Sequence, residues 1–468
     1  MSKIKEFFQG RKDENIFSLD GAVPLNKAIP FGIQHVLSMF VANIAPLLIV
    51  FAMVGASNEI TSNGIRSAIF IAGIGTIIQL YPIGGRVGSR LPIVVGLSFT
   101  FVGVLGLVGA TYGLGTMFIS IIIGGLVIGV LGLFAKYWRR FIKPIVSSMV
   151  VLGIGLSLLA VGVKQFIQYN TCVIDGVYHF EMAWPYLIVA SSALLSSILF
   201  QILVPGVWKN INILVGLVVG YIVAICFGLV DFSIIPTSSV TDFIDIPKPV
   251  FLFVNFSWND FNIGAILITL LIYLVAMTEG IGDISSLAQA GLSRDPTDRE
   301  ISGGLSCDGF VSAVAGVFGA LPLTTFSQNV GIVGQTKVVN RFTILMGAIL
   351  LILTSFFPIL SNVLMTIPDA VLGGTMVMLF SSIAVIGMKM LSECGFTKKN
   401  IIIISLGLGL GFGITLVSEF FANNFENSFL NSLMLILQNP VANMFIISLL
   451  LSYIIPDKIN DAPAEQDE

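Results

Sequence analysis

The sequence predicts an all-α polytopic membrane protein, and three observations support this prediction. Hydrophobic residues make up 56% of the 468 residues and charged residues only 10%, whereas soluble domains carry about 25% charged residues. Apolar runs close to the length of about 20 residues that a helix needs to cross a bilayer recur along the chain. With both termini in the cytoplasm, only Arg66, Lys164 and Lys248 of the 23 Lys and Arg residues fall in external loops, which is the asymmetry of the positive-inside rule.

The apolar runs predict fourteen transmembrane segments, seven in each half of the chain. Because seven is odd, the two halves would have inverted topology. In the first half the segments lie near 28–54, 67–81, 91–107, 117–134, 145–163, 185–204 and 211–229. In the second half they lie near 261–281, 303–320, 321–341, 342–360, 370–386, 401–417 and 441–455.

Charged connections separate several of these segments on the expected cytoplasmic side. GGRVGSR at 84–90 and AKYWRRFIKP at 135–144 are basic turns, and GLSRDPTDRE at 291–300 is a short charged loop. On the expected external side, the longer loop 230–260 contains four aspartates.

The third and tenth segments are interrupted, and they hold equivalent positions in the two halves. Pro92, Gly96 and Ser98 break the third, and the tenth is the polar, glycine-rich stretch LPLTTFSQNVGIVGQTKVVNR at 321–341. Paired broken segments in inverted halves commonly mark a transport site, because irregular backbone at bilayer depth needs protein or a watery cavity around it. We expect a short extended piece followed by a half-helix in each segment. The alternative is a glycine-rich helix whose amides bond to neighbouring helices.

Ionisable side chains fall inside the predicted spans, where a charge costs about 2.5–3.5 kcal/mol and usually serves function. Glu279 and Asp283 are four residues apart and share a helix face. We expect Glu279 to bind solute or protons, whereas Asp283 can equally cap or fix a helix junction. Asp308 either takes part in coupling to a cation or caps its helix. His35 either takes part in coupling or holds two helices together.

The run Gln328-Asn329-x-Gly331-x4-Thr336-Lys337 resembles the signature of the nucleobase–ascorbate transporter family. The family's other marked segments are similar to TEGIGD at 278–283, CDGFVSAVAGVFG at 307–319, GLSFTF at 96–101 and the Gln34–His35 pair. The resemblance covers essentially the whole transmembrane region.

The resemblance implies fourteen spans in two inverted repeats, with a core domain that moves like an elevator against a gate domain. Members are usually dimers and carry nucleobases with protons or sodium. We therefore expect a homodimer in the plasma (inner) membrane. The expected parts are a cytoplasmic N-terminal segment 1–25, the core 26–140 and 255–362, the gate 141–232 and 363–456, and a cytoplasmic tail 457–468.

Carried over by position, Glu279 and Gln328 would be the main substrate contacts. Phe99, beside Ser98, would stack on the base or offer its backbone N–H, although an ordinary packing role for this phenylalanine is the alternative. Asn329 would support the site.

Coupling to a cation would involve Glu279, Asp308 and His35. We expect proton symport, because all three side chains can change protonation, and sodium is the alternative. Four further residues would support the site structurally: Gln34, Asp283, Gly331 and Thr336.

The expected substrate is an oxidised purine, which presents alternating C=O and N–H groups around a flat ring. A carboxylate only accepts hydrogen bonds, so Glu279 suits ring N–H groups, whereas the Gln328 carboxamide can pair with adjacent N–H and C=O groups. Glutamine at the first signature position resembles xanthine and uric acid carriers, and glutamate there resembles uracil carriers. We favour xanthine or uric acid. A uracil–proton symporter remains the alternative, because the TKV at 336–338 resembles the uracil branch.

Other classes fit the sequence less well. An anion carrier of the sulfate or bicarbonate kind could share the plan, but the acidic Glu279 argues against it. An enzyme is not expected, because no nucleophile–base pair or soluble domain is visible. The scattered cysteines and two histidines predict neither a metal site nor a cofactor. Binding of nucleic acid is not expected, because the sequence has no basic arm. The expected partners are a nucleobase, membrane lipid and a second copy of the chain.

Overall fold

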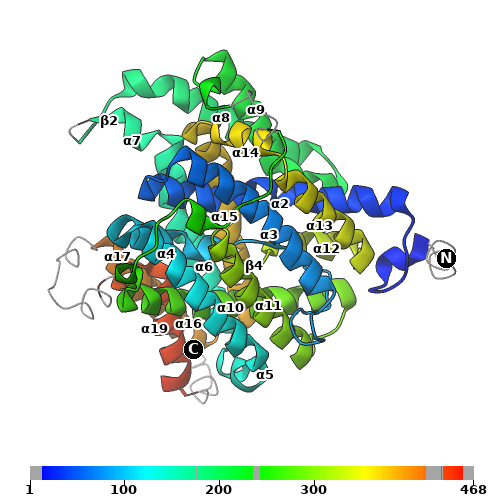
Figure 1. The fold of residues 1–468 in the computed structure, drawn as a ribbon. Helices are drawn as coiled ribbons and strands as arrows, with labels where there is room; N and C mark the ends of the chain where they lie inside the picture. Colours follow the sequence, from blue (N-terminus) through cyan, green and yellow to red (C-terminus); the bar gives the residue numbers. More distant parts are fainter. Residues whose placement is uncertain (1–12, 175, 236–242, 418–433, 435, 457–468) are drawn as a thin grey trace, which may run out of the picture.

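The helices follow the apolar runs of the sequence. The computed structural model describes residues 13–174, 176–235, 243–417, 434 and 436–456 (Figure 1). In the first half of the chain the elements are η1 (Asp13–Phe17), α2 (Leu25–Val54), α3 (Asn58–Leu80), β1 (Val95–Leu97), η2 (Phe99–Phe101), α4 (Val102–Leu133), α5 (Ala135–Trp138), η3 (Arg139–Phe141), α6 (Pro144–Phe166), α7 (Tyr169–Cys172), β2 (Val173–Ile174), β3 (Val177–Tyr178), α8 (Phe180–Leu203), η4 (Gly206–Ile211) and α9 (Asn212–Cys226).

The second half of the chain again consists mainly of long helices and includes one further short strand. Its elements are η5 (Phe232–Ile234), η7 (Val250–Leu252), η8 (Trp258–Asp260), α10 (Ile263–Leu292), α11 (Asp298–Val317), β4 (Leu323–Thr325), α12 (Ser327–Thr336), α13 (Arg341–Ser355), α14 (Pro358–Met365), α15 (Asp369–Cys394), α16 (Lys398–Leu406), the π-helix η9 (Gly407–Phe412), α17 (Gly413–Leu416) and α19 (Pro440–Ile454).

The long helices make this a polytopic membrane protein. Within the described residues, nine helices are long and apolar enough to cross a membrane, and the pair α13–α14, bent by 81°, makes a tenth. The predicted count of fourteen is higher because it divides α4 into two segments and adds three elements that are shorter or more polar. These three are α11, α12 and α19.

Helix α4 contains a break at Gly113, where the backbone leaves the helical region with φ 90° and ψ 168°. A positive φ of this kind costs glycine little. The break lies between residues 107 and 117, where the sequence predicts the connection between the third and fourth segments. The end of the third predicted segment and the whole of the fourth therefore lie on the two arms of one interrupted helix.

The prediction that Arg66 lies in a loop is wrong. Helix α3 begins at Asn58 after the N-cap Ser57, so Arg66 lies within the helix and its side chain is buried. The guanidinium reaches Asp245 in the loop between α9 and α10, with 3.3 Å between Nη1 and Oδ2. Hydropathy misses this turn of helix because the charge is satisfied by protein rather than by water.

Asp245 also lies 3.1 Å from the ammonium group of Lys248. Burial by itself raises the pKa of the Asp245 carboxyl, but the hydrogen bond to Lys248 and the charges of Arg66 and Lys248 outweigh it. The pKa of Asp245 therefore lies below its usual value, and the carboxylate stays charged beside the two cations.

One end each of the predicted eighth and ninth segments is also wrong, for a related reason. Helix α10 continues to Leu292 rather than ending near residue 281. Helix α11 begins at Asp298 rather than near residue 303, behind a capping box in which Thr297 and Glu300 bond to each other's backbone. Hydropathy alone cannot distinguish a helix end that contains polar residues from a connection, so it places both ends too close to the apolar part of the helix.

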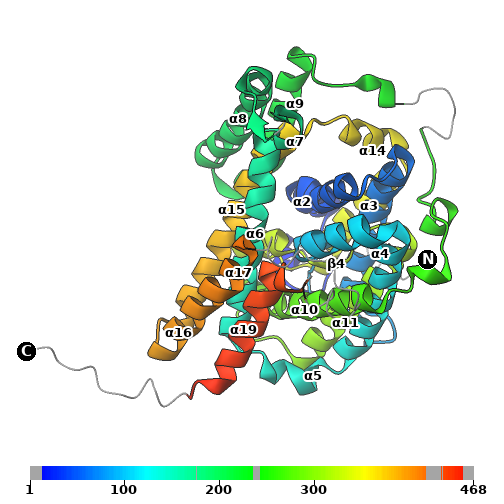
Figure 2. The ribbon, with the colours of Figure 1, turned by 90° about the vertical axis from the view of Figure 1, so that its left-hand side faces the viewer.

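The helices gather in two groups (Figures 1 and 2). One contains α6, α8, α9, α15, α16, α17 and α19, and the other contains α2, α3, α4, α10, α11, α12 and α13. Glycines allow close approach inside each group: a Cβ on Gly155 of α6 would lie 2.3 Å from the Ala384 nitrogen of α15, and one on Gly125 of α4 would lie 2.5 Å from the Ala313 nitrogen of α11. We call the boundary between the two groups the seam.

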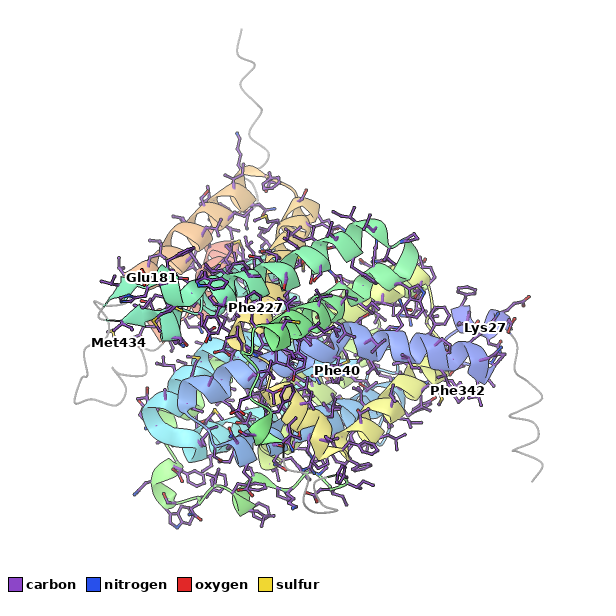
Figure 3. The ribbon with its side chains drawn as sticks, turned by 90° about the horizontal axis from the view of Figure 1, so that it is seen from above. Lys27, Phe40, Glu181, Phe227, Phe342 and Met434 are labelled. Carbon is purple, nitrogen blue, oxygen red and sulfur yellow. The ribbon has the colours of Figure 1, made fainter. Side chains whose placement is uncertain are left out.

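The segment before α2 is fixed against the start of α13. Asn340 is buried, and its side-chain amide donates to the carbonyls of Asn15, Ser18 and Gly21 at 2.9–3.0 Å. Its carbonyl oxygen caps α13. The starts of α2 and α13 accordingly lie at the same end of the molecule, as Lys27 and Phe342 show in Figure 3.

Candidate functional site

The third and tenth predicted segments meet as a pair of short strands. Strand β1 runs antiparallel to β4, with Gly96 opposite Thr324. A helix follows each strand directly, α4 by way of η2 after β1 and α12 after β4. The predicted extended pieces followed by half-helices are confirmed, and the alternative of a continuous glycine-rich helix is wrong for the residues of β4.

Side chains of neighbouring helices hold β1 from its free edge. Asn43 of α2 accepts a hydrogen bond from the Leu97 backbone nitrogen at 2.7 Å. Thr76 of α3 accepts one from the Val95 nitrogen at 3.0 Å. A two-stranded ribbon leaves half of its backbone groups unpaired, and inside a membrane protein these groups need protein partners. The two polar side chains supply them.

Strand β4 is held in the same way from α11. Ser312 accepts from the Leu323 nitrogen at 2.9 Å, and the Asp308 carboxylate accepts from the Thr325 nitrogen at 3.1 Å. The second Asp308 oxygen accepts from the Gln79 amide at 2.9 Å. Since Thr297 caps α11, the reading of Asp308 as a helix cap is wrong. Asp308 instead ties β4 to α11 and α3.

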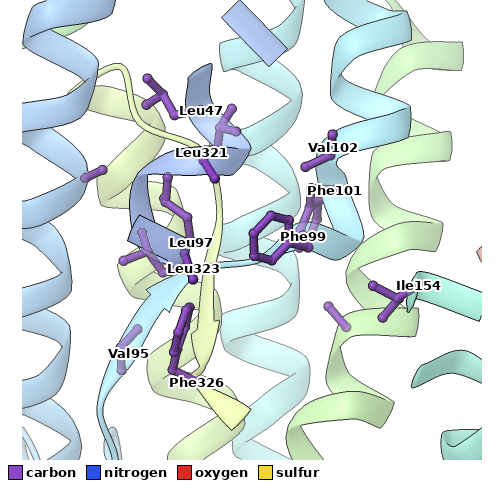
Figure 4. Close-up of a cluster of buried hydrophobic side chains, with 14 of the residues drawn as sticks. Leu47, Val95, Leu97, Phe99, Phe101, Val102, Ile154, Leu321, Leu323 and Phe326 are labelled. Atoms are coloured by element: carbon purple, nitrogen blue, oxygen red, sulfur yellow. The ribbon is translucent and has the colours of Figure 1, made fainter. Parts of the chain in front are cut away.

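A cavity of about 230 Å³ lies beside the paired strands, at the seam. It contains five of the predicted site residues, and Figure 4 shows one of them, Phe99, just beyond the end of β1. The lining residues are Ser38, Leu97, Ser98, Phe99, Val151, Ile154, Gln201, Asn210, Asn212, Ile213, Glu279, Thr324, Thr325, Phe326, Ser327, Gln328, Gly331, Gln335, Leu379, Ser382, Ile383 and Ile386.

Two carboxylates of α10 reach the two broken segments. Glu279 lines the cavity and accepts a hydrogen bond from the Thr100 hydroxyl at 2.7 Å, at the start of the helix after β1. Asp283, one turn further on, accepts from the Ser327 hydroxyl at 2.8 Å, at the first residue of α12. Negative charge is favourable at helix N-termini. Glu279 thus lines the cavity, whereas Asp283 lies where α10 meets the start of α12.

The other predicted cavity contacts come from both broken segments. Ser98 and Phe99 line it after β1, and Gln328 and Gly331 line it from α12. A Cβ added to Gly331 would meet no atom within 4 Å, so this glycine borders open space. The Phe99 ring also meets Phe380 of α15 edge to face, with 5.2 Å between the ring centres.

His35 and Asn329 lie together outside the cavity lining. The Asn329 amide nitrogen lies 3.0 Å from His35 Nδ1 and donates to the His35 carbonyl at 3.2 Å. Both side chains are buried, and this pair joins α2 to α12. The geometry fits the reading of His35 as a contact between two helices.

The two remaining predicted residues also lie away from the cavity lining. Gln34 is buried within α2. Thr336 ends α12, where its hydroxyl donates to the Ile332 carbonyl at 2.9 Å and accepts from the Val338 nitrogen at 3.1 Å.

The opposite wall of the cavity comes from residues that the sequence did not single out. Asn210 of η4 approaches Gln335 of α12, with 3.5 Å between Nδ2 and Oε1, so this contact crosses the seam. Asn212 of α9 donates to Gln201 of α8 at 3.3 Å, within one helix group. These amide side chains lie at the ends of apolar runs. Polar residues are common there because helices are connected there, so no feature of the sequence marks them as cavity residues.

A second cavity of about 280 Å³ lies along the same seam. Helices α2, α6 and α15 contribute to both cavities. On α6 the first cavity includes Val151 and Ile154, and the second includes Val161 and Lys164, so about seven residues, or roughly 10 Å of helix, separate their nearest lining residues. The second cavity lies toward the end where Asp369 begins α15.

One pair of aromatic side chains lies close to both cavities. Phe380 is buried on α15 and meets Phe99 from the other helix group. A Cβ on Gly162 of α6 would lie 3.2 Å from the Phe380 ring, which places this ring close to α6. The Phe99–Phe380 contact therefore borders the first cavity and reaches the part of α6 that lines the second.

A cavity between two helix groups, bordered by two broken segments that pair with each other and by a carboxylate and a carboxamide, is the arrangement of a secondary transporter. The family comparison agrees. Residues 26–420 match the model of a permease family, and the chain belongs to this family, the nucleobase–ascorbate transporters. Its relatives are permeases, so the protein is a transporter and not an enzyme.

Several relatives resemble the chain over most of its length. It is 33% identical to the xanthine permease XanQ of Escherichia coli, covering 94% of each chain. It is 30% identical to the xanthine permease of Bacillus subtilis, over 84% of this chain and 87% of that one. It is 28% identical to the uric acid transporter UacT of Escherichia coli, over 88% of this chain and 83% of that one.

Solved structures share the fold at lower identity. The transmembrane domain of the cyanobacterial bicarbonate transporter BicA matches with a TM-score of 0.52 and 16% identity, over 92% of this chain and 98% of that one. The murine anion transporter Slc26a9 in the inward-facing state matches with a TM-score of 0.56 and 12% identity, over 91% of this chain and 68% of that one.

Proposed function

We propose that the protein imports an oxidised purine base, xanthine or uric acid, by proton symport. The observation that carries the proposal is the shared cavity of Glu279, Gln328 and Phe99, which come from α10, α12 and the segment after β1. The relatives named for xanthine and uric acid transport support the choice of substrate.

The three side chains divide the recognition of a purine between them. The Glu279 carboxylate accepts from ring N–H groups, and the Gln328 carboxamide pairs with an adjacent N–H and C=O. Phe99 covers one face of the ring. A wrong substrate would leave buried polar groups unpaired, at a cost of about 1–3 kcal/mol each, which is a source of selectivity.

Uracil is the second candidate substrate. Its specific support is the TKV at 336–338, which resembles the uracil branch of the family. Because uracil shares the N–H and C=O edge of xanthine and lacks the second ring, relative affinity for the two bases separates the candidates. An inorganic anion carrier is less well supported, because Glu279 lines the cavity.

The proposed motion is an elevator-like movement of the core, 26–140 and 255–362, against the gate, 141–232 and 363–456. The two helix groups follow this division, and the two cavities at opposite positions along the seam suit alternating access. The similarity to BicA and Slc26a9 is consistent with the same plan.

The proposal includes fourteen spans in two inverted repeats, which require α4 to be counted as two segments at the Gly113 break. It also places both termini in the cytoplasm, the segments 1–25 and 457–468 among them, and the protein in the plasma membrane as a homodimer. The asymmetry of basic residues supports this orientation.

Equilibrium binding tests the substrate. Purified protein is heated with xanthine, uric acid, hypoxanthine, guanine or uracil, and the midpoint of unfolding is recorded. We expect the largest stabilisation from xanthine or uric acid. In Gln328→Glu, affinity for these purines should fall about 5- to 150-fold, because a carboxylate cannot donate. Gln335→Glu, the same change at another lining residue, is the control, and uracil as the strongest ligand of the unchanged protein would refute the purine assignment.

Uptake into vesicles tests the coupling ion. Accumulation of labelled xanthine should increase with an inward proton gradient and collapse with a protonophore. The titratable groups available for this are Glu279, Asp308 and His35. Accumulation driven by sodium at equal internal and external pH would instead assign the coupling to sodium, and inhibition by sulfate but not by uric acid would support an anion carrier.

A further inference from the structure

Three charged connections of the sequence come together at one end of the molecule. The turn after α3, the end of α4 with α5, and the start of α11 enclose a cavity of about 650 Å³. These are parts of the stretches 84–90, 135–144 and 291–300, and the proposed transport mechanism uses none of them. The cavity lies outside the seam, on the helix group that contains the paired strands.

Cations dominate the lining of this cavity. Arg86, Lys136 and Arg299 line it together with one carboxylate, Asp298. Asp298 is already paired with Arg139, at 2.5 Å between Oδ1 and Nη2. The cavity therefore carries an excess of positive charge that the described residues do not neutralise.

Two of the three cations are available for a ligand. The exposed side chain of Arg86 makes no hydrogen bond or ion pair with the described residues. The ammonium group of Lys136 lies 4.7 Å from the centre of the Tyr137 ring, a contact that leaves its N–H donors exposed. Arg299 donates to the Gly85 carbonyl at 2.7 Å, which fixes its guanidinium at the rim.

The surroundings place this cavity at the depth of lipid headgroups. Phe134 and Tyr137 line it and are 53% and 59% exposed. Exposed aromatic side chains of this kind are typical of the membrane–water interface. The apolar side chains of the preceding turns of α4 are exposed as well and form a stripe that leads toward the cavity: Leu126, Val127, Val130 and Leu131.

We propose that this cavity binds the phosphate headgroup of an anionic phospholipid, with an acyl chain along the stripe on α4. The cations supply the charge-assisted hydrogen bonds that a phosphate accepts, and basic pockets on the cytoplasmic side of membrane proteins bind such headgroups. Soluble phosphate offers the same charge but makes no use of the stripe. The site lies on α4, α5 and α11, so the bound lipid belongs to the helix group that contains the paired strands.

The test compares lipids with the intact chain in a neutral detergent. Phosphatidylglycerol, phosphatidylcholine or inorganic phosphate is added, and the midpoint of unfolding and the mass of bound lipid are measured. We expect phosphatidylglycerol to raise the midpoint and to remain bound in the mass spectrum, while the other two do neither. An equal effect of phosphatidylcholine, or an equal effect of inorganic phosphate, would overturn the proposal.

Charge-removing variants localise the effect. In Arg86→Gln/Lys136→Gln the stabilisation by phosphatidylglycerol should fall at least twofold. The control is Lys389→Gln/Lys398→Gln, which removes two charges from exposed lysines of the other helix group and should keep the full effect. If the first double variant does not fold, Arg86→Gln and Lys136→Gln are measured singly, and an unchanged response in both would refute the site.

Discussion

At the scale of single residues, Glu279 and Asp283 show how one helix can serve two roles. They are one turn apart on α10, yet one carboxylate borders the cavity and the other meets the first residue of α12. The sequence places both on one helix face but not beside their partners. Thr100 and Ser327 are distant in the chain, and only the pairing of the strands brings them to α10.

Gly331 offers a test of cavity size. Because its added Cβ would project into open space beside the cavity, Gly331→Ala should fold normally and weaken the binding of uric acid and xanthine about tenfold, with a smaller effect on uracil. Thermal shift and competition binding measure both properties.

Gly334→Ala is the matched control for this substitution. Its Cβ would lie 3.3 Å from the Ala290 Cβ rather than in the cavity, so affinity should stay close to that of the unchanged protein. Equal loss in both variants would mean that α12 had shifted and that Gly331 does not border the bound substrate.

The sequence predicted the cavity residues on the side of the paired strands but not those on the opposite wall. Polar residues inside apolar runs identified Glu279 and Gln328, because their presence at bilayer depth needs a reason. Asn210 and Gln201 lie at the ends of such runs, where polar side chains are ordinary, so nothing in the sequence marked them as cavity residues.

At the scale of elements, the paired strands depend on hydrogen bonds from outside the ribbon. Spacing and glycine content predicted two extended pieces, but not the helices that satisfy them. Thr76 and Ser312 look like ordinary small residues of buried helices, and their roles become visible only when β1 and β4 are in place. Hydropathy likewise could not give the true starts of α3 and α11, whose polar first turns are satisfied by protein.

Thr76 allows this dependence to be measured. Thr76→Val keeps the shape of the side chain but removes the acceptor of the Val95 N–H, so a buried donor is left unpaired at a cost of about 1–3 kcal/mol. We expect a lower midpoint of unfolding and weaker xanthine binding, because Phe99 follows the same strand.

Thr76→Ser retains the hydroxyl and should preserve binding. The comparison separates loss of the hydrogen bond from loss of packing, since serine also removes the methyl group. If valine proved harmless while serine was damaging, packing of the methyl group and not the bond to β1 would be the function of Thr76.

At the scale of the whole molecule, the proposed elevator-like motion would break contacts that cross the seam and keep those within one helix group. The Asn210–Gln335 contact crosses the seam, and the Gln201–Asn212 contact does not. The two pairs have the same chemistry and similar separations, so they form a natural comparison.

Disulfide cross-linking uses this comparison. In a variant without the four native cysteines, oxidation of Asn210→Cys/Gln335→Cys should abolish xanthine uptake, and reduction should restore it. The pair Gln201→Cys/Asn212→Cys should cross-link without loss of uptake. Full uptake by the first pair after complete cross-linking would show that the two groups do not move apart at this point.

The hydrogen bonds between β1 and β4 have a mechanical consequence. They join two stretches of chain that lie more than 200 residues apart in sequence, and side chains of α2, α3 and α11 accept hydrogen bonds from the backbone of these strands. Under the proposed motion, a bound substrate would keep its contacts with the paired strands and with the helices that follow them, while its contacts with the other helix group would change. The energy barrier to this movement would then depend mainly on the contacts at the seam, so the rate of transport and the substrate selectivity could be adjusted separately.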